Sequence, residues 1–261
     1  MVPCKPPWSR PYAHVDNRGT CTYDAGVRSE GHTYNVSNPM VRRCIVVDLG
    51  LMDFRKARSK QKEAADSPDR AESDVLYLVE HPPVITIGRS GDRKNVLVAD
   101  EKLRSYGVEL IDTDRGGDVT YHGPGQLVAY PILNLDKHRR DVGWYLRSLE
   151  EAILKTLLDL GIQARRIKGY TGVWVEDKKI AAIGIGVRRW ITFHGVALNV
   201  APCLDHFALI TPCGIQDKGV TSVRAVLGHD VPKEKLIEQF LHRFGEVFNL
   251  DVVRLDDASR P

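Results

Sequence analysis

The segment GVWVEDKKIAAIGIGVRRWITFHGVALNV, residues 172–200, decides the fold class of this chain of 261 residues. It holds three runs rich in apolar and β-branched residues, at Val173–Val175, Ile180–Val187 and Ile191–Val200. Such runs favour β-strands, and strands that follow one another this closely favour antiparallel pairing. We therefore predict an antiparallel meander over residues 172–200.

Short β-rich runs also dominate the chain before this segment, and helical patterns interrupt them only occasionally. The expected strands are Arg42–Leu49, Val75–Val79, Val84–Ile87, Val108–Ile111 and Leu127–Leu133. The expected helices are Met52–Ala65, residues 143–160 with an apolar stripe at Leu146, Leu149, Ile153 and Leu157, and Pro232–Phe248 with Leu236, Phe240 and Phe244 on one face. Strands of mixed spacing with few helices predict an α+β fold, with a mixed, mainly antiparallel sheet flanked by helices.

The chain divides into one large domain and two short ends. Residues 1–39 carry Pro3, Pro6, Pro7, Pro11 and Pro39 and show no apolar periodicity, so we expect a flexible N-terminal extension. Because Met40 directly precedes the first expected strand, one hypothesis is that translation begins there. Residues 40–255 are the expected single domain, and residues 256–261 are the expected C-terminal tail.

Composition narrows the classes of function. The chain is 43% apolar and 27% charged, as globular proteins are. No apolar run approaches the roughly 18 residues of a membrane span, and the N-terminus lacks a signal-peptide core, so we expect a soluble cytoplasmic protein without membrane contact. A net charge of +3 gives no reason to expect nucleic acid as a partner. The sequence contains no coiled-coil pattern that would indicate an oligomer, so we expect a monomer.

One local cluster of charge leaves two interpretations open. The residues Arg165, Arg166, Lys168, Arg188 and Arg189 are either a basic face that attracts an acidic protein partner or ordinary solvated surface.

The five cysteines, at positions 4, 21, 44, 203 and 213, include no C-x-x-C pair. That pattern argues against a disulfide scaffold and against a zinc ribbon. The spacing of His194, Cys203, His206 and Cys213 fits no compact zinc pattern, and no metal is expected. Cys213 is the candidate reactive thiol, because a cysteine between proline and glycine in a loop tends to be accessible.

The densest irregular segment is RGGDVTYHGPGQ, residues 115–126, with four glycines and a proline in twelve positions. Glycine permits positive φ and close backbone approach, so this loop either wraps a ligand with exposed N–H groups or is an ordinary tight turn. It matches neither a Walker A loop nor G-x-G-x-x-G, which disfavours a phosphate cradle.

A second unusual segment is KIAAIGIG, residues 179–186, where small residues replace the bulky ones that a buried strand prefers. A slender alkyl chain lying in the resulting groove would gain about 0.8 kcal/mol per buried methylene. The alternative is close packing of the helix at residues 143–160 against these small residues.

Taken together, these segments resemble the lipoyl(octanoyl) transferases of the LipB type. RGGDVTYHGPGQ with the following YPI is similar to the family's signature. Further similar motifs follow in the family's order: EHPP at 80–83, TGVWV at 171–175, KIAAIG at 179–184, FHGVALN at 193–199 and PCGI at 212–215. The resemblance covers roughly residues 42–250 and implies the fold of the biotin and lipoate protein ligases, which agrees with the α+β prediction.

The resemblance implies that residues 40–255 are an octanoyltransferase catalytic domain of lipoate biosynthesis. The donor would be octanoyl-acyl carrier protein, and the acceptor a lysine of lipoyl-domain proteins, namely 2-oxoacid dehydrogenase E2 subunits and the glycine cleavage H protein. By the resemblance, Cys213 is the acyl-accepting nucleophile, Lys179 is its partner, and no cofactor is needed. His122 either positions the reacting groups or fixes the loop through hydrogen bonds.

The resemblance also implies a set of substrate-binding residues. They are Arg115, Gly116, Gly117, Asp118, Val119, Thr120, Tyr121, His122, Ala182, Ile183, Gly184, Gly195, Val196 and Ala197.

Three other functions stay open at the level of sequence. An ATP-dependent lipoate or biotin ligase of the same fold would not need Cys213. A non-catalytic module would bind acyl groups or carrier proteins without a covalent adduct. A transferase that moves the acyl group between two lipoyl-bearing proteins would use the same chemistry as an octanoyltransferase that takes the group from acyl carrier protein.

Overall fold

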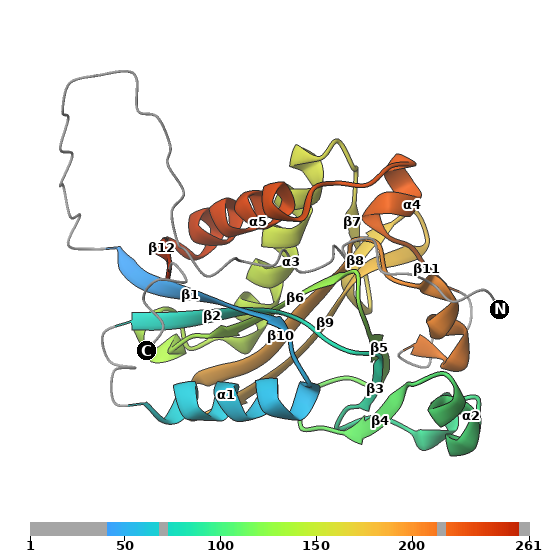
Figure 1. Cartoon of the computed structure of the whole chain (residues 1–261). Helices are drawn as coiled ribbons and strands as arrows, with labels where there is room; N and C mark the ends of the chain where they lie inside the picture. The colour runs from blue at the N-terminus through green and yellow to red at the C-terminus, as the bar shows by residue number, and fades with distance from the viewer. Residues whose placement is uncertain (1–40, 68–72, 213–217, 256–261) are drawn as a thin grey trace, which may run out of the picture.

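The computed structural model describes residues 41–67, 73–212 and 218–255. Two sheets and the helices around them make up this part of the chain (Figure 1). The strands are β1 Arg42–Leu51, β2 Ser73–Glu80, β3 Val84–Ile87, β4 Glu109–Asp112, β5 Val119–His122, β6 Gln126–Ile132, β7 Arg165–Ile167, β8 Tyr170–Val175, β9 Lys178–Arg188, β10 Ile191–Asn199, β11 Gly219–Val220 and β12 Leu250–Arg254. The helices are α1 Phe54–Asp66, α2 Asp100–Ser105, α3 Val142–Asp159, α4 Val223–Leu227 and α5 Lys233–Phe248, with 3-10 turns at Arg93–Asn95, Leu135–Lys137 and Leu204–Leu209.

The large sheet has the strand order β12-β1-β2-β6-β10-β9-β8-β7, with the short β11 paired to β9. The β1 pairs with β2 and β12 are parallel, and so is the β11 pair with β9. The remaining pairs of this sheet, from β2 to β7, are antiparallel. The mixed, mainly antiparallel sheet and the meander over residues 172–200 are therefore confirmed.

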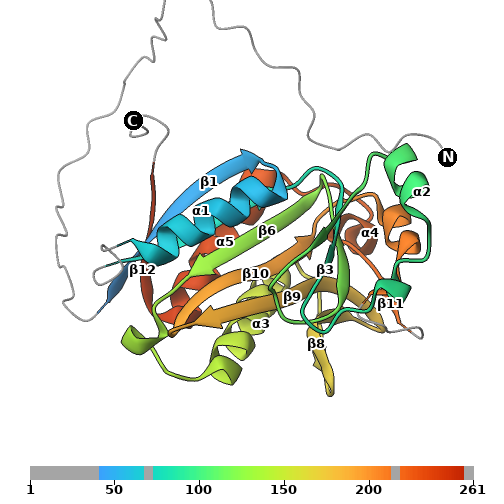
Figure 2. The ribbon, with the colours of Figure 1, turned by 90° about the horizontal axis from the view of Figure 1, so that it is seen from below.

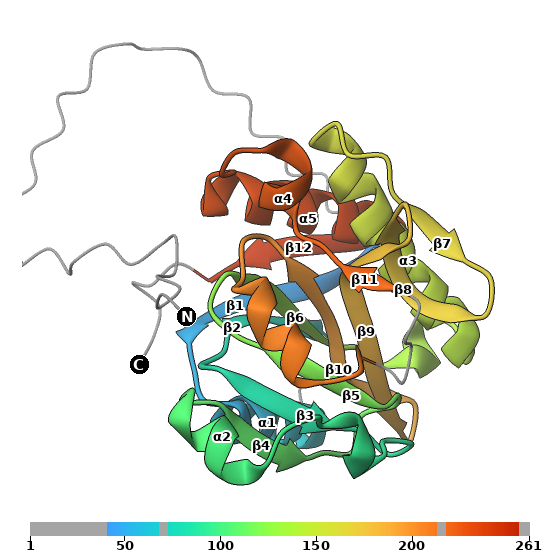
Figure 3. The same ribbon diagram turned by 90° about the vertical axis from the view of Figure 1, so that its right-hand side faces the viewer.

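The two faces of the large sheet are covered by different elements. The helices α3 and α5 pack on one face, and α1 lies on the other with the small sheet β4-β3-β5 (Figures 1 and 3). Seen from below, α1 runs alongside the strands of the large sheet (Figure 2). The main apolar core lies between the sheet and α3 and α5, where Leu149, Ile153 and Phe240 are almost fully buried.

The helix α3 shows how the sequence sets these elements. The Asp141 side chain caps its first turn, accepting a hydrogen bond from the Trp144 backbone N–H at 2.8 Å, which satisfies a donor that the helix itself leaves unpaired. Of the predicted apolar stripe, Leu149, Ile153 and Leu157 are buried in the core. Leu146 is only half-buried and lines a cavity on the sheet. None of the described helices is long and apolar enough to cross a membrane.

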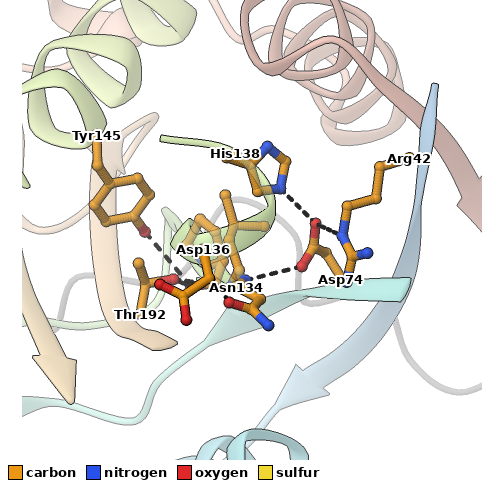
Figure 4. Close-up of polar contacts among 9 residues, drawn as sticks. Arg42, Asp74, Asn134, Asp136, His138, Tyr145 and Thr192 are labelled. Atoms are coloured by element: carbon orange, nitrogen blue, oxygen red, sulfur yellow. Dashed lines mark hydrogen bonds and ion pairs between the residues drawn. The ribbon is translucent and has the colours of Figure 1, made fainter. Parts of the chain in front are cut away.

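A buried carboxylate ties β2 to two neighbouring segments (Figure 4). Asp74 is fully buried and accepts hydrogen bonds from Arg42 Nε at 2.8 Å, from His138 Nε2 at 2.7 Å and from the Asn134 backbone N–H at 3.0 Å. Nearby, the Thr192 hydroxyl donates to Pro131 O at 2.7 Å and accepts from the Leu133 N–H at 2.8 Å. These contacts hold the end of β6 and the turn after it against β1 and β10.

One expectation about local structure was wrong. The segment 115–126 is not a continuous loop, because residues 119–122 form β5, which pairs antiparallel with β3 from Val84↔His122 to Ile87↔Val119. The glycines flank this strand and do not interrupt it. The expected tails at 1–39 and 256–261 lie outside the described residues.

Candidate active site

A cavity of about 520 Å³ opens between residues 115–122 and one face of the large sheet. Most residues that the sequence assigned to substrate binding line it: Arg115, Gly116, Gly117, Asp118, Thr120, His122, Ala182, Ile183, Gly184, Gly195, Val196 and Ala197. Lys179 lines the same cavity. Segments that lie far apart in the sequence thus form one enclosure.

Val119 and Tyr121 do not line the cavity, although the sequence placed them in the same set. Successive side chains of a strand point to opposite faces, so Thr120 and His122 face the cavity and Val119 and Tyr121 face away. Both pack in a separate apolar cluster with Phe207 and Leu209. The Tyr121 hydroxyl lies 2.7 Å from Nδ1 of His206.

The floor of the cavity is formed by small residues on adjacent strands. Gly184 pairs with Gly195, and Ala182 pairs with Ala197, across β9 and β10. Residues opposite each other in an antiparallel pair share a face, so these four positions form one strip with little side-chain volume. On the other face of β9, Ala181 packs in the core beneath α3. Packing of α3 against small residues is therefore observed on that face, and an alkyl chain on the cavity face stays a prediction.

Arg115 fastens the glycine-rich segment over this floor. Its buried guanidinium donates to Thr86 O at 2.7 Å, to Thr86 Oγ1 at 2.9 Å and to Gly116 O at 3.0 Å. The Gly116 N–H donates to Ile185 O of β9 at 2.8 Å. This N–H is used within the fold, so it is not one of the exposed donors that the composition of the loop suggested.

Lys179 projects from β9 and is buried, with 7% of its surface exposed, whereas its neighbour Lys178 is exposed. Its Nζ lies 4.8 Å from the centre of the Trp174 ring, within the range of a cation–π contact. The Thr221 N–H donates to Lys179 O at 3.0 Å, next to the parallel pairing of β11 with β9. Cys213, the expected partner of Lys179, lies outside the described residues, so this pairing stays a prediction.

Three histidines surround the Phe54 ring, which forms one wall of the cavity together with His122 and His194. The ring centre of Phe54 lies 5.4 Å from His81, 6.3 Å from His122 and 6.3 Å from His194. Burial lowers the pKa of His81 to about 4 and the pKa of His122 to about 3. Burial also lowers the pKa of His194. This wall is therefore uncharged at neutral pH.

Two of these histidines are held by fixed partners. His81 Nδ1 donates to Met52 O at 2.7 Å, because a carbonyl only accepts, and its Nε2 lies 2.8 Å from the Tyr130 hydroxyl. His194 Nε2 lies 2.9 Å from Oδ1 of Asp114, which also pairs with Arg58. The hydrogen bond from His194 and the charge of Arg58 keep the pKa of Asp114 below its usual range. The ionised Asp114 therefore accepts a hydrogen bond from Nε2 of His194.

The sequence did not single out several residues that line the cavity, chiefly Phe54, Val128, Tyr130, Tyr170 and Thr171. Phe54 begins α1, where it has the pattern of an ordinary apolar residue of an amphipathic helix. Tyr130 belongs to the YPI motif and Thr171 to TGVWV, but neither was assigned a role. That membership was the only signal in the sequence that could have pointed to them.

A second cavity, of about 720 Å³, lies at the far end of β9. Arg58, Lys62, Arg89, Arg188 and Arg189 line it together with Asp66 and Asp114.

The basic residues that the sequence grouped together do not form one face. Arg165 lies across β8 from the Lys179 end of β9, and nine residues of strand, about 30 Å, separate Lys179 from Arg188. Arg165 and Arg166 are also paired with acidic residues, Asp177 and Glu150. A single basic face formed by all five residues is therefore absent from the described part of the chain.

The residues considered for a metal site lie apart. His194 contacts Asp114 and His206 contacts Tyr121. Cys203 precedes the 3-10 turn at Leu204–Leu209, and its side chain makes no capping hydrogen bond. Cys213 lies outside the described residues. Within residues 41–67, 73–212 and 218–255, no three His, Cys, Asp or Glu side chains gather in a way that could hold a metal ion.

The fold and the cavity define a catalytic domain, and comparison with known proteins specifies its class. The model of the lipoyl protein ligase A/B catalytic domain matches residues 55–245. An octanoyltransferase of Solibacter usitatus is 47% identical over 82% of this chain and 96% of its own length. One of Alkaliphilus metalliredigens is 46% identical over 80% of this chain and 96% of its own length. The chain belongs to the octanoyltransferases, an acyltransferase branch of the lipoyl protein ligase A/B family.

Solved structures confirm the fold. The bipartite lipoate protein ligase of Thermoplasma acidophilum has a TM-score of 0.63 and 18% identity, over 84% of this chain and 88% of that chain. A lipoate-protein ligase A bound with ATP has a TM-score of 0.61 and 18% identity, over 83% of this chain and 90% of that chain. At this level of identity the comparison establishes the shared fold and leaves the reaction to the site.

Proposed function

We propose that this chain transfers an octanoyl or lipoyl group from acyl carrier protein to a lysine of a lipoyl-domain protein, through a thioester on Cys213. The observation that carries the proposal is the floor of Ala182, Gly184, Gly195 and Ala197, which leads along β9 to the buried Lys179. A narrow apolar groove that ends at a cation suits a medium-length acyl chain whose reactive carbonyl lies at one end.

Burial of the alkyl chain provides the binding energy. The six methylenes of an octanoyl group, at about 0.8 kcal/mol each, contribute about 5 kcal/mol when fully buried. The histidine wall and the floor carry no charge, and the guanidinium of Arg115 above the floor is hydrogen-bonded to Thr86 and Gly116. We expect the ammonium of Lys179 to lie beside the carbonyl.

The chemistry then follows from a thiol and an amine. A free cysteine, with a pKa near about 8.5, is mostly protonated at neutral pH, and a nearby ammonium stabilises its thiolate. The Cys213 thiolate attacks the thioester carbonyl, and an acyl-enzyme forms as the C–S bond of the donor breaks. The leaving phosphopantetheine thiolate takes a proton from the Lys179 ammonium, which leaves Lys179 neutral. The amine of the acceptor lysine attacks this second thioester, and Lys179 in its neutral form takes the proton from that amine.

The pairing of β11 with β9 supports the assignment of Lys179. Gly219 and Val220 lie beside Lys178 and Lys179, and they follow Cys213 by only six and seven residues in the sequence. A chain of six residues spans at most about 20 Å, so this pairing is compatible with the proposed partnership of Lys179 and Cys213. We further propose that the protein acts as a cytoplasmic monomer, without cofactor, membrane or nucleic acid.

The test is the intact mass of the purified protein after incubation with octanoyl-acyl carrier protein, without ATP. We expect an added mass of about 126 Da, the mass of an octanoyl group that replaces one hydrogen. Cys213→Ser should show no adduct. Cys203→Ser, a matched control at a half-buried cysteine, should acylate as the wild type does.

The same experiment separates the proposal from its alternatives. If transfer requires ATP and survives Cys213→Ser, the chain is a ligase. If acyl groups bind without adduct or transfer, it is a binding module. A lipoyl domain that already carries the acyl group, used as donor in place of the carrier protein, tests transfer between two lipoyl-bearing proteins.

A further inference from the structure

A buried chain of hydrogen bonds connects the strand next to Lys179 with His122. The Thr221 carbonyl accepts from Asn199 Nδ2 at 3.0 Å, and Asn199 Oδ1 accepts from Gln126 Nε2 at 2.9 Å. Gln126 Oε1 in turn lies 3.1 Å from His122 Nδ1. The Thr221 N–H also donates to Lys179 O. Asn199, Gln126 and His122 are all buried.

This chain of hydrogen bonds is the Thr221–Asn199–Gln126 relay. Two backbone carbonyls fix the direction of every bond in it. Thr221 O can only accept, so the side of Asn199 that faces it must be the NH2 group. Tyr121 O likewise accepts from Gln126 Nε2 at 3.2 Å, so the other end of the Gln126 amide is its oxygen. An oxygen without hydrogens can only accept, and His122 Nδ1 must therefore carry the proton.

This assignment leaves Nε2 of His122 as an acceptor with a lone pair. His122 lines the cavity, and its Nε2 has no hydrogen-bond partner among the described residues. By contrast, both ring nitrogens of His81 are used within the fold. Burial also keeps the ring of His122 neutral at physiological pH, with a pKa of about 3. Because His122 lines the cavity, a donor from the substrate can reach this acceptor.

We infer that the Thr221–Asn199–Gln126 relay holds His122 as a fixed neutral acceptor, and that Nε2 accepts an N–H from the attacking amine of the acceptor lysine. His122 would then orient the lone pair of that amine toward the acyl carbon, and Gln126 and Asn199 are positioning residues that act through His122. This inference rests on the proposed function.

The choice of the amine follows from the chemistry of the two half-reactions. The acyl chain and its thioester carbonyl carry no N–H or O–H group, whereas the attacking amine carries at least two N–H bonds. The strand register places the relay near Lys179. Gln126 pairs with Asn199. The next residue of β10, Leu198, pairs with Ala181, which lies two residues from Lys179. His122 is too weak a base to keep the proton at neutral pH, so Lys179 remains the proton acceptor.

The experiment measures the two half-reactions separately by intact mass in the full-length protein. The first is formation of the acyl-enzyme from octanoyl-acyl carrier protein, and the second is single-turnover transfer from that acyl-enzyme to a lipoyl domain. His122→Asn keeps a donor at the position of Nδ1 but has no atom at Nε2. We expect the second step to slow by about tenfold more than the first, the equivalent of one hydrogen bond. His122→Gln, which places a side-chain oxygen near Nε2, should recover part of the loss.

A positioning role for Gln126 gives an independent readout. In Gln126→Glu a carboxylate faces Nδ1, which raises the pKa of His122 and protonates Nε2 at acidic pH. The transfer step of this variant should lose rate on the acid side at a pH where the wild-type rate is flat. In ¹⁵N-histidine NMR spectra of the wild type, His122 should show one protonated and one unprotonated nitrogen without titration near neutrality.

The outcomes distinguish a failure of the proposed function from a failure of the inference about His122. If the wild-type protein forms no acyl adduct, the proposed function fails. If it acylates and transfers, and His122→Asn transfers at the wild-type rate, the inference alone is wrong and His122 only fixes the loop. A loss confined to the first half-reaction also overturns it, because the donor would then belong to the phosphopantetheine arm.

Discussion

Gly184 and Gly195 lie directly opposite each other across β9 and β10, at the middle of the cavity floor. A Cβ atom at Gly195 would lie 2.2 Å from Ala129 O, and one at Gly184 would lie 3.0 Å from both Arg115 Cδ and Gly116 O. Neither position tolerates a side chain without movement of its neighbours. The residues of the strip are therefore small because the neighbouring strand and the Arg115 segment approach it closely.

Gly195→Ala should destabilise the protein by about 1–3 kcal/mol, the usual cost of overpacking a core. The clash is with a backbone oxygen of β6, which cannot rotate away as a side chain would. Thermal unfolding followed by circular dichroism measures the effect. Gly143→Ala is the matched control, because the nearest atom there is the Asp141 side-chain oxygen at 3.2 Å and alanine favours a helix. Equal stability of the two variants would contradict the packing argument.

Lys179→Met should slow octanoyl transfer by about a hundredfold or more, as expected when a general base is removed. Methionine keeps the approximate length and apolar stem of lysine, so the loss would come from the missing amine. The contact with Trp174 contributes only about 0.5–2 kcal/mol, and the variant should remain folded. Single-turnover transfer with purified protein checks this, and Lys178→Met on the exposed neighbour is the control. A variant that transfers at the wild-type rate would remove Lys179 from the mechanism.

Arg115→Lys should loosen the glycine-rich segment and weaken acyl binding. The guanidinium donates to Thr86 O, Thr86 Oγ1 and Gly116 O at the same time, and the compact ammonium of lysine cannot reproduce that planar arrangement. Loss of one charge-assisted hydrogen bond costs about 1.5–3 kcal/mol. The expected results are a lower melting temperature and a higher KM for the octanoyl donor. Arg104→Lys, at an exposed arginine of α2, is the matched control, and the same behaviour in both variants would show that Arg115 does not fasten the segment.

The meander over residues 172–200 was predictable because its runs are long, rich in β-branched residues and close in sequence. The strand β5 was not, because all four of its residues are buried and glycines flank it on both sides, so it shows no alternation. The same absence of alternation hid which side chains face the cavity. Thr120 and His122 point to one face of β5, and Val119 and Tyr121 point to the other. Which pair faces the cavity is set by the pairing of β5 with β3, which the sequence does not show.

Other parts of the site depend on contacts that are distant in sequence. Phe54 reaches the cavity because α1 packs over β6 and β10, and no pattern within residues 52–65 indicates that contact. The relay from Thr221 to His122 joins four segments, and each of its residues has alone the pattern of an ordinary buried polar group. By contrast, the resemblance to octanoyltransferases pointed to Lys179 as a site residue. In the structure Lys179 is buried, whereas Lys178 is exposed.

Asp74→Ala should destabilise the fold by about 3–5 kcal/mol, as expected when one partner of a buried ion pair is removed. The change leaves Arg42, His138 and the Asn134 N–H without their shared acceptor. Chemical denaturation measures the loss, and the activity of each folded molecule should be preserved because the cluster lies outside the cavity. Asp136→Ala, which removes a largely exposed pair with Arg140, should have little effect. A similar loss of stability in both variants would mean that the burial of Asp74 does not increase its contribution to the free energy of unfolding.

Acid should destabilise the protein well before its carboxylates are protonated. Burial lowers the pKa of His81 from 6.5 to about 4 and that of His122 from 6.5 to about 3. Between these values and pH 6.5 the unfolded chain binds more protons than the folded chain, so the free energy of unfolding rises with pH in this window. The contribution is therefore fully present above about pH 6.5 and falls as the pH decreases, by up to about 1.4 kcal/mol per pH unit for each histidine.

Denaturant titrations from about pH 7 to about pH 4 measure this slope across the window in which the unfolded histidines gain protons. His122→Asn removes one of the two groups, so the slope of its unfolding free energy against pH should be smaller than that of the wild type. Substitution of the exposed His229 by asparagine is the matched control and should leave the slope unchanged. If the wild type and His122→Asn lose stability in parallel as the pH falls, His122 is not held neutral in the folded protein. The acceptor at Nε2 would then be protonated, and the proposed contact with the attacking amine would be repulsive.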